Sequence, residues 1–182
     1  MQTVLPVLAG DLRTTDRTLR RAVRDGLIRG SRLSPRKFDM PIEERAYLQA
    51  NWPLLAGLRD ALRTEPSVRA AVLFGSYARG DQHLSSDIDI LVQAQPGTSM
   101  RGIANRLRER FDTPFQLIAL EDAEVAPLLL AEIVREGRVL VDRNQLWPRL
   151  TANRGRIERT AARERKRIDT ELEAAFGSSR AA

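Results

Sequence analysis

The spacing of apolar residues changes from helical to strand-like near the middle of the chain. Between Pro41 and Arg63, apolar residues recur at helical spacing and predict one long helix, which Pro53 is expected to kink or split. An unbroken apolar run then extends from Val68 to Phe74 and ends at a Gly-Ser pair. Such a run predicts a buried strand followed by a tight turn.

Helices and strands are then predicted to alternate. The pattern favours helices at 99–111 and 127–135, and strands at 87–92, 115–120 and 138–141. A final arginine-rich helix is predicted over Leu150–Phe176. The order of these elements predicts an α/β (α+β) fold followed by a C-terminal helix.

The first 40 residues have a different pattern, typical of a winged helix-turn-helix. A short helix is expected over Thr3–Ala9 and a second one up to Asp25, capped by Thr14 or Thr15 and ended by Gly26. Basic segments on both sides of Ser34-Pro35 resemble a β-ribbon or wing. These elements predict a domain at 1–40, a linker helix at 41–65, a domain at 66–142 and a C-terminal segment at 143–182.

The charge distribution suggests a role for the N-terminal domain. The chain of 182 residues has a net charge of +6, with +5 on residues 1–40, −3 on residues 41–148 and +4 on the remainder. Arginines at helical spacing can bind phosphates or guanine edges from the major groove. We therefore expect DNA binding through these basic residues: Arg17, Arg20, Arg21, Arg24, Arg32, Arg36 and Lys37. The alternative is a small helical domain for dimerisation or for guarding a site, with its arginines on solvated faces.

Composition excludes several classes of protein. Hydrophobic residues make up 42% and charged residues 30% of the chain, as in globular proteins. The chain has no cysteine, which excludes disulfides, thiolate metal sites and thiol catalysis. No apolar run approaches the ~20 residues of a membrane span, and the N-terminus is a poor signal peptide. We therefore expect a cytoplasmic protein without a membrane partner.

Two carboxylates predict a cation site. Along a strand, residues i and i+2 point to the same face, so Asp87 and Asp89 project together while Ile88 and Ile90 point to the other face. Two neighbouring carboxylates repel each other, and Mg²⁺ would relieve this repulsion while binding substrate phosphates. The Gly75-Ser76 turn allows backbone N–H groups to approach a phosphate closely. The alternative is an exposed acidic pair without a metal.

These residues resemble the signature of a known superfamily. Gly75-Ser76, Arg79-Gly80, Ser86-Asp87 and Asp89 are similar to the GS…RG…SDxD motif of the minimal nucleotidyltransferase (MNT) branch of the nucleotidyltransferases. The resemblance extends over about residues 66–142 and implies a small mixed-sheet nucleotidyltransferase fold. It also implies catalytic and metal-binding roles for Asp87 and Asp89, with Mg²⁺ or Mn²⁺. Nucleotide-binding roles are implied for five further residues: Gly75, Ser76, Arg79, Gly80 and Ser86.

One position departs from the family pattern. A third metal-binding carboxylate usually lies on the strand that corresponds to residues 115–120, where this chain has Gln116. A glutamine supplies a neutral oxygen and cannot act as a base. Glu121 and Asp122 could substitute only if their loop turned back. Binding without turnover is therefore the alternative to catalysis.

The resemblance implies transfer of a nucleoside monophosphate from a nucleoside triphosphate, with ATP preferred, to a macromolecular acceptor. Its relatives often belong to toxin–antitoxin pairs, where they adenylylate a partner toxin or act on tRNA. The alternative is a DNA-binding regulator with a weakly active or inactive nucleotidyltransferase domain. A homodimer built on the C-terminal helix is a third hypothesis. His83, the single histidine, is expected to be solvated in the loop.

Overall fold

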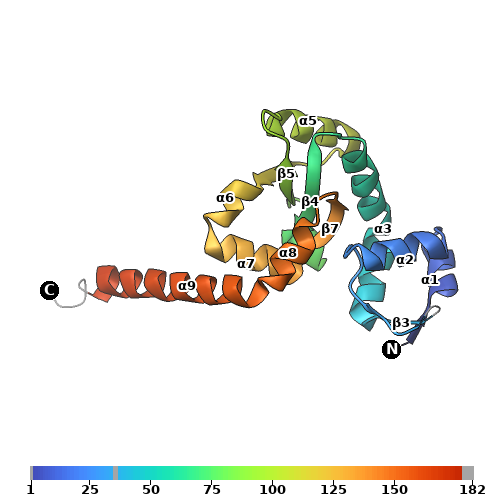
Figure 1. Ribbon diagram of the computed structural model, residues 1–182, viewed down its shortest axis with the longest axis horizontal. Helices are drawn as coiled ribbons and strands as arrows, with labels where there is room; N and C mark the ends of the chain where they lie inside the picture. Colours follow the sequence, from blue (N-terminus) through green and yellow to red (C-terminus); the bar gives the residue numbers. More distant parts are fainter. Residues whose placement is uncertain (1, 35–36, 178–182) are drawn as a thin grey trace.

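The computed structural model describes residues 2–34 and 37–177. An N-terminal unit lies on one side of a central sheet, and a long C-terminal helix extends from the other side (Figure 1). A single long helix, α3 (Ile42–Arg63), connects the N-terminal unit to the sheet. The predicted mixed α/β architecture is confirmed.

The N-terminal unit combines two short helices with a small antiparallel sheet. The elements in chain order are β1 (Gln2–Val4), α1 (Leu5–Asp11), α2 (Asp16–Arg24), β2 (Ser31–Arg32) and β3 (Lys37–Asp39). The sheet order is β1-β3-β2. The predicted first helix at 3–9 is wrong at its start, because backbone pairing with β3 extends residues 2–4 into a strand. The second helix begins as expected at Thr15, whose side chain accepts a hydrogen bond from the Thr18 N–H.

Helix α3 holds the two parts of the chain together. It runs as one element through Pro53, which therefore does not split it. Tyr47, Leu48 and Trp52 are buried in one hydrophobic cluster that includes Leu19 of α2 and Ile90 of the central sheet. Tyr47 and Trp52 are therefore core residues, at 8% and 6% exposure. Because the cluster is continuous, the N-terminal unit is packed onto the rest of the molecule rather than tethered to it.

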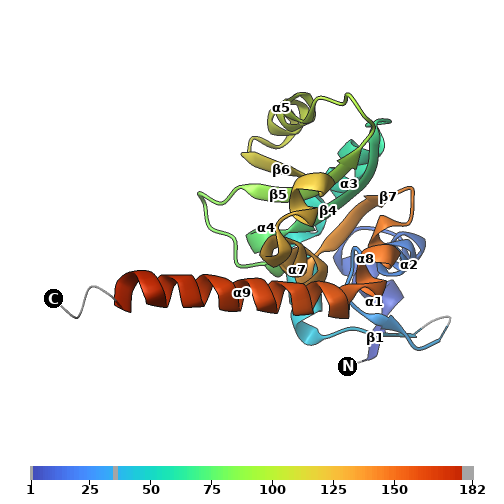
Figure 2. The ribbon, with the colours of Figure 1, turned by 60° about the vertical axis from the view of Figure 1, so that its left-hand side comes forward.

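The central sheet has four strands in the order β6-β5-β4-β7. These strands are β4 (Val68–Phe74), β5 (Ile88–Ala94), β6 (Phe115–Ala119) and β7 (Arg138–Asp142). β4 pairs antiparallel with β5 and β7, whereas β5 and β6 are parallel (Figure 2). Asp87 precedes β5, so the predicted strand begins one residue later than expected.

Helices cover both faces of this sheet. One face contributes Leu73, Ile88 and Ile90 to the cluster that contains α3 and α5 (Met100–Phe111). The other face contributes Phe74 and Leu91 to a second cluster. The helices of that second cluster are α6 (Leu120–Glu124), α7 (Pro127–Glu136), α8 (Leu146–Ala152) and α9 (Arg154–Gly177).

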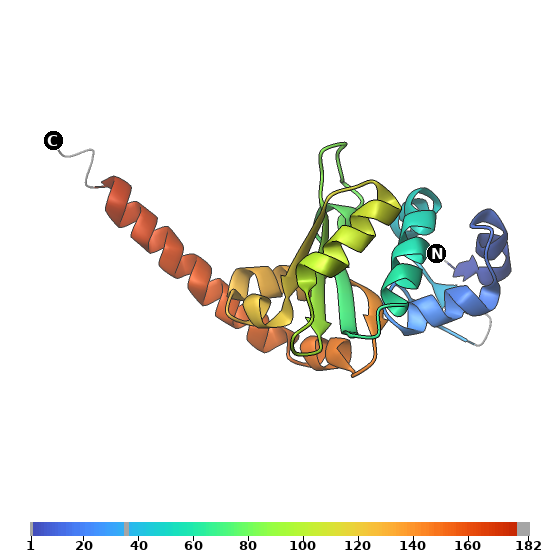
Figure 3. The ribbon, with the colours of Figure 1, turned by 90° about the horizontal axis from the view of Figure 1, so that it is seen from above.

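The C-terminal segment differs from the predicted single helix. It consists of α8 and α9, separated at Asn153, whose side chain and backbone N–H groups both bond to the Arg149 carbonyl. Ile157 and Ala161 of α9 are buried, and the helix then extends away from the body (Figure 3). Among the described residues, no helix combines the length and apolarity needed to span a membrane.

Candidate functional site

The turn between β4 and α4 (Gly75–Arg79) is built around glycine. Gly75 has φ +70°, and a Cβ there would collide with the Asp89 carboxylate. Gly80 ends α4 with φ +93°, and a Cβ there would lie 2.8 Å from the Tyr47 ring. The Tyr47 hydroxyl also donates a 2.8 Å hydrogen bond to the Tyr77 carbonyl. The glycines thus allow the turn to lie tightly between α3 and the start of β5.

Asp89 lies on the sheet face that bears α7. In register it pairs with Phe74 on β4 and with Gln116 on β6. The pKa of Asp89 is raised to about 6, mainly because the carboxylate is partly buried. The nearby carboxylates of Asp87 and Glu132 also raise it, whereas Arg79 lowers it. Ile88 and Ile90 are buried on the opposite face, as the alternation predicted.

The pairing also defines the position of Gln116. Its side chain is exposed and shares a sheet face with Asp89, on the neighbouring strand. The resemblance to the MNT signature in the sequence implies a third carboxylate at this position. A neutral amide therefore lies where that carboxylate would stand.

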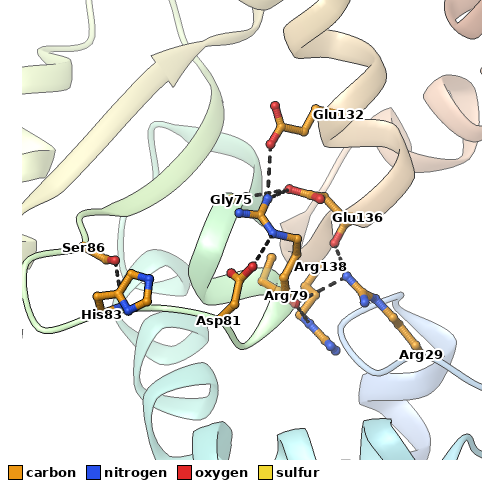
Figure 4. A network of polar contacts seen from close by, with 10 residues as sticks. Arg29, Gly75, Arg79, Asp81, His83, Ser86, Glu132, Glu136 and Arg138 are labelled. Carbon is orange, nitrogen blue, oxygen red and sulfur yellow. Dashed lines mark hydrogen bonds and ion pairs between the residues drawn. The ribbon is translucent and has the colours of Figure 1, made fainter.

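A second acidic group, absent from the sequence prediction, lies behind the turn. Glu136 Oε1 accepts hydrogen bonds from the Gly75 N–H at 3.1 Å and from Arg79 Nη1 at 2.7 Å (Figure 4). Arg79 also bonds Glu132 at 3.2 Å and Asp81 at 3.1 Å. Glu136 is only 6% exposed, and burial raises its pKa despite these partners. Its only signal in the sequence is an acidic residue at the end of an apolar helix.

The remaining predicted nucleotide-binding residues lie around this turn. The Ser76 carbonyl accepts hydrogen bonds from the Gly80 and Asp81 N–H groups, which closes α4. Ser86 Oγ accepts the His83 N–H at 2.9 Å and so orders the loop before Asp87, while the His83 side chain is exposed. The structure therefore gathers the predicted residues at the ends of β4 and β5.

Few protein side chains are available to coordinate a divalent ion at this site. In the part of the chain that the structure describes, no cluster of three or more His, Cys, Asp or Glu side chains could hold a metal. Asp87 and Asp89 lie close enough for Asp87 to raise the Asp89 pKa, so both favour a nearby cation. Two carboxylates fit Mg²⁺ that takes its other ligands from substrate phosphates and water.

The predicted DNA-binding residues cluster on the N-terminal unit. Arg17, Arg21 and Arg24 are exposed on α2, whereas Arg20 is partly buried and donates to Asp16. Arg32 lies in β2 and Lys37 in β3. Arg36 lies outside the described residues.

Comparison with known protein families gives a match over residues 57–146, just under half of the chain. The matching family is described as "Polymerase beta, Nucleotidyltransferase". The range contains the turn, Asp87, Asp89 and Gln116. This supports a nucleotidyltransferase domain in the part of the chain that carries the site.

The chain is also similar to the protein adenylyltransferase MntA of Shewanella oneidensis, with 33% identity over 93 residues. That stretch covers 50% of this chain and 59% of MntA, so the chain spans less than two thirds of this relative.

Two solved structures extend the comparison. A toxin–antitoxin crystal structure with AMP-PNP superimposes with a TM-score of 0.53 at 26% identity, over 65% of this chain and 97% of that chain. A structure of the toxin–antitoxin MntA–HepT has a TM-score of 0.50 at 22% identity, over 66% of this chain and 97% of its own, and shows the fold alone.

Proposed function

We propose that this protein transfers a nucleoside monophosphate from a nucleoside triphosphate to a macromolecular acceptor, as a component of a toxin–antitoxin pair. The observation that carries the proposal is the contact between the Gly75 turn and Asp89. In this proposal the turn binds a phosphate and Asp89 binds the metal ion, and the two lie together at adjacent strand ends. The proposed division into 1–40, 41–65, 66–142 and 143–182 assigns this site to the third segment.

The comparisons favour ATP and a protein acceptor. MntA is named a protein adenylyltransferase, and a related toxin–antitoxin structure contains AMP-PNP. We therefore propose a partner toxin as the acceptor, with tRNA as the other acceptor to be tested.

The chemistry requires a hydroxyl oxygen of the acceptor to attack the α-phosphorus. A new P–O bond forms as the α–β bridging P–O bond breaks, pyrophosphate leaves and the hydroxyl proton is released. Asp87 and Asp89 would hold Mg²⁺ or Mn²⁺, which neutralises charge on the triphosphate when bound. Gly75, Ser76 and Arg79 would bind the phosphates, while Gly80 and Ser86 fix the turn and the loop.

The decisive experiment measures label transfer from α-labelled ATP, CTP, GTP and UTP to tRNA and to lysate protein, with Mg²⁺ or Mn²⁺. The expected result is a labelled acceptor with wild-type protein and none with the Asp87→Ala/Asp89→Ala variant. Label transfer by that variant would contradict the proposal. Label that appears only with Gln116→Asp would indicate a domain that binds nucleotide without turnover.

A second candidate function is DNA binding by the N-terminal unit. It is favoured by the α1–turn–α2 arrangement beside a three-stranded antiparallel sheet, with exposed arginines along α2. We propose that these elements form a winged helix-turn-helix, whose second helix would enter the major groove. A salt-dependent gel shift with duplex DNA should be lost in Arg17→Ala/Arg24→Ala, and a shift that this variant retains would contradict it.

A further inference from the structure

A hollow of about 530 Å³ lies where the N-terminal unit meets the nucleotidyltransferase domain. We call it the junction cavity, and it lies between α2, the end of α3 and the segment from β7 to α8. Five arginines line it: Arg21, Arg24, Arg59, Arg63 and Arg143. It does not include the Gly75 turn or the carboxylates of the proposed nucleotide site.

The acidic residues of the junction cavity do not balance these arginines. Asp25 accepts from both Arg24 and Arg59. The Asp142 carboxylate instead accepts the N–H groups of Leu146 and Trp147, at 2.9 and 3.0 Å, and so caps α8. Positive charge is therefore in excess around the cavity.

The arginines differ in how many of their N–H groups already donate hydrogen bonds within the protein. The Arg143 guanidinium is already hydrogen-bonded to the backbone, because it donates to four carbonyls between residues 63 and 68. Arg21 and Arg63 are exposed and have no acidic partner among the described residues. Arg59 is 7% exposed, and within the described residues its Nε has no hydrogen-bond partner. A buried donor without a partner is rare, and an anion in the cavity would supply one.

The junction cavity adjoins two further hollows that share its arginines. Arg21, Arg59 and Arg63 also line a hollow of about 250 Å³ together with Arg17. Arg21 and Arg24 line a groove of about 580 Å³ between α2 and β3, together with Arg17 and Arg20. Arg17, Arg21 and Arg24, at positions i, i+4 and i+7 of α2, thus each line at least two of these three hollows.

The two parts of this surface are fixed relative to each other. The Val139 N–H of β7 donates to the Gly26 carbonyl at 3.1 Å, directly behind α2. A Cβ on Gly26 would lie 3.1 Å from Val139 and 3.2 Å from Trp147, which shows how closely the units meet. The basic surface therefore continues without a hinge from α2 to α3.

We propose that the junction cavity binds a backbone phosphate of the same double-stranded nucleic acid that α2 contacts. The nucleic acid then lies across both units, with α2 in its groove and the ends of α3 and β7 against its backbone. A duplex fits better than a free nucleotide, because basic groups recur over three adjoining hollows as phosphates recur along a strand. This inference rests on the second candidate function.

The test uses the full chain and a fluorescein-labelled duplex of random sequence, with anisotropy measured over a series of NaCl concentrations. Arg63→Gln should weaken binding and reduce the slope of log K against log [NaCl] by about 0.9, the value for one lost phosphate contact. Arg101→Gln is the matched control, since Arg101 is an exposed arginine of α5 that lines none of the three hollows. It should bind as wild type.

Three results would overturn the inference, and they differ in meaning. If Arg63→Gln matches Arg101→Gln while Arg17→Gln weakens binding, DNA binding stands but the junction cavity is not part of it. If the wild-type protein binds no duplex, both DNA binding and this inference fail. If Arg63→Gln abolishes an ATP-induced change in Trp fluorescence but leaves duplex binding intact, the cavity binds free nucleotide.

Discussion

Arg138 and Glu44 form a buried bidentate ion pair, with Nη1–Oε1 at 2.6 Å and Nη2–Oε2 at 2.8 Å. Both side chains are almost inaccessible, at 1% and 4% exposure. Arg138 also stacks on the Tyr47 ring, 3.6 Å from its centroid, and donates to the Ala78 carbonyl at 2.8 Å. This pair joins α3 to β7 and holds the end of α4 under the proposed site.

The same carboxylate reaches the N-terminal unit. Glu44 Oε1 accepts the Arg29 N–H at 2.9 Å, and the Arg29 guanidinium donates to the Glu136 carbonyl at 2.5 Å. Arg29, which precedes β2, therefore also supports the proposed nucleotide site.

Glu44→Gln should strongly destabilise the fold, because it leaves the Arg138 charge buried without a counter-ion. Breaking a buried pair in this way costs about 3–5 kcal/mol. Urea denaturation followed by circular dichroism measures this loss. The control is Glu43→Gln, an exposed neighbour in the same helical turn that should cost almost nothing. Equal stability of the two variants would show that the pair contributes little.

Stability should depend on the protonation of Asp89 in metal-free protein. Its pKa is raised to about 6 in the folded state, so between pH 4 and 6 the folded protein binds more protons than the unfolded chain. Stability should therefore fall as the pH rises through this window.

Asp89→Asn removes this cost and should raise the melting temperature at pH 8, measured in EDTA. Partial exposure of the site limits the gain to roughly 1 kcal/mol, or about 2–4 °C. At pH 4 the variant and wild type should differ little. A variant that is destabilised at pH 8 would contradict the assigned direction of the pKa shift.

Gly75→Ala should reduce nucleotide binding more than tenfold, because the added methyl collides with the Asp89 carboxylate at a positive φ. Gly97→Ala provides the control. Gly97 has a similar φ of +78° but no atom within 4 Å of an added Cβ. It should show only the backbone cost of about 1 kcal/mol and unchanged nucleotide binding, measured by calorimetry. Equal binding losses would mean that backbone strain, rather than the contact with Asp89, is responsible.

Glu136→Gln should strengthen triphosphate binding several-fold. The Glu136 carboxylate caps the Gly75 N–H and repels a phosphate, whereas a neutral amide repels it less. Glu132→Gln is the comparison, since Glu132 bonds Arg79 without a hydrogen bond to Gly75. Weaker binding by Glu136→Gln in a fluorescence titration would instead make Glu136 a residue that positions the turn.

The local pattern of the sequence determined the elements and the candidate carboxylates. The apolar run at Val68–Phe74 and the alternation from Asp87 to Ile90 are sufficient to predict two strands. Strand periodicity then assigns each residue of the alternating segment to one face of the sheet. The role of the glycines in the turn could also be predicted from the sequence, because a tight turn of this kind needs the conformational freedom of glycine.

Tertiary structure alone decided which distant groups meet. Arg138 and Glu44 are 94 positions apart, and nothing in their local sequence marks them as partners. The same holds for Glu136 at Gly75 and for Arg59 at α2, because helix packing and strand order, not spacing along the chain, create these contacts. The sequence therefore indicated the residues of the candidate site, whereas the fold decided which groups support them and where the basic surface extends.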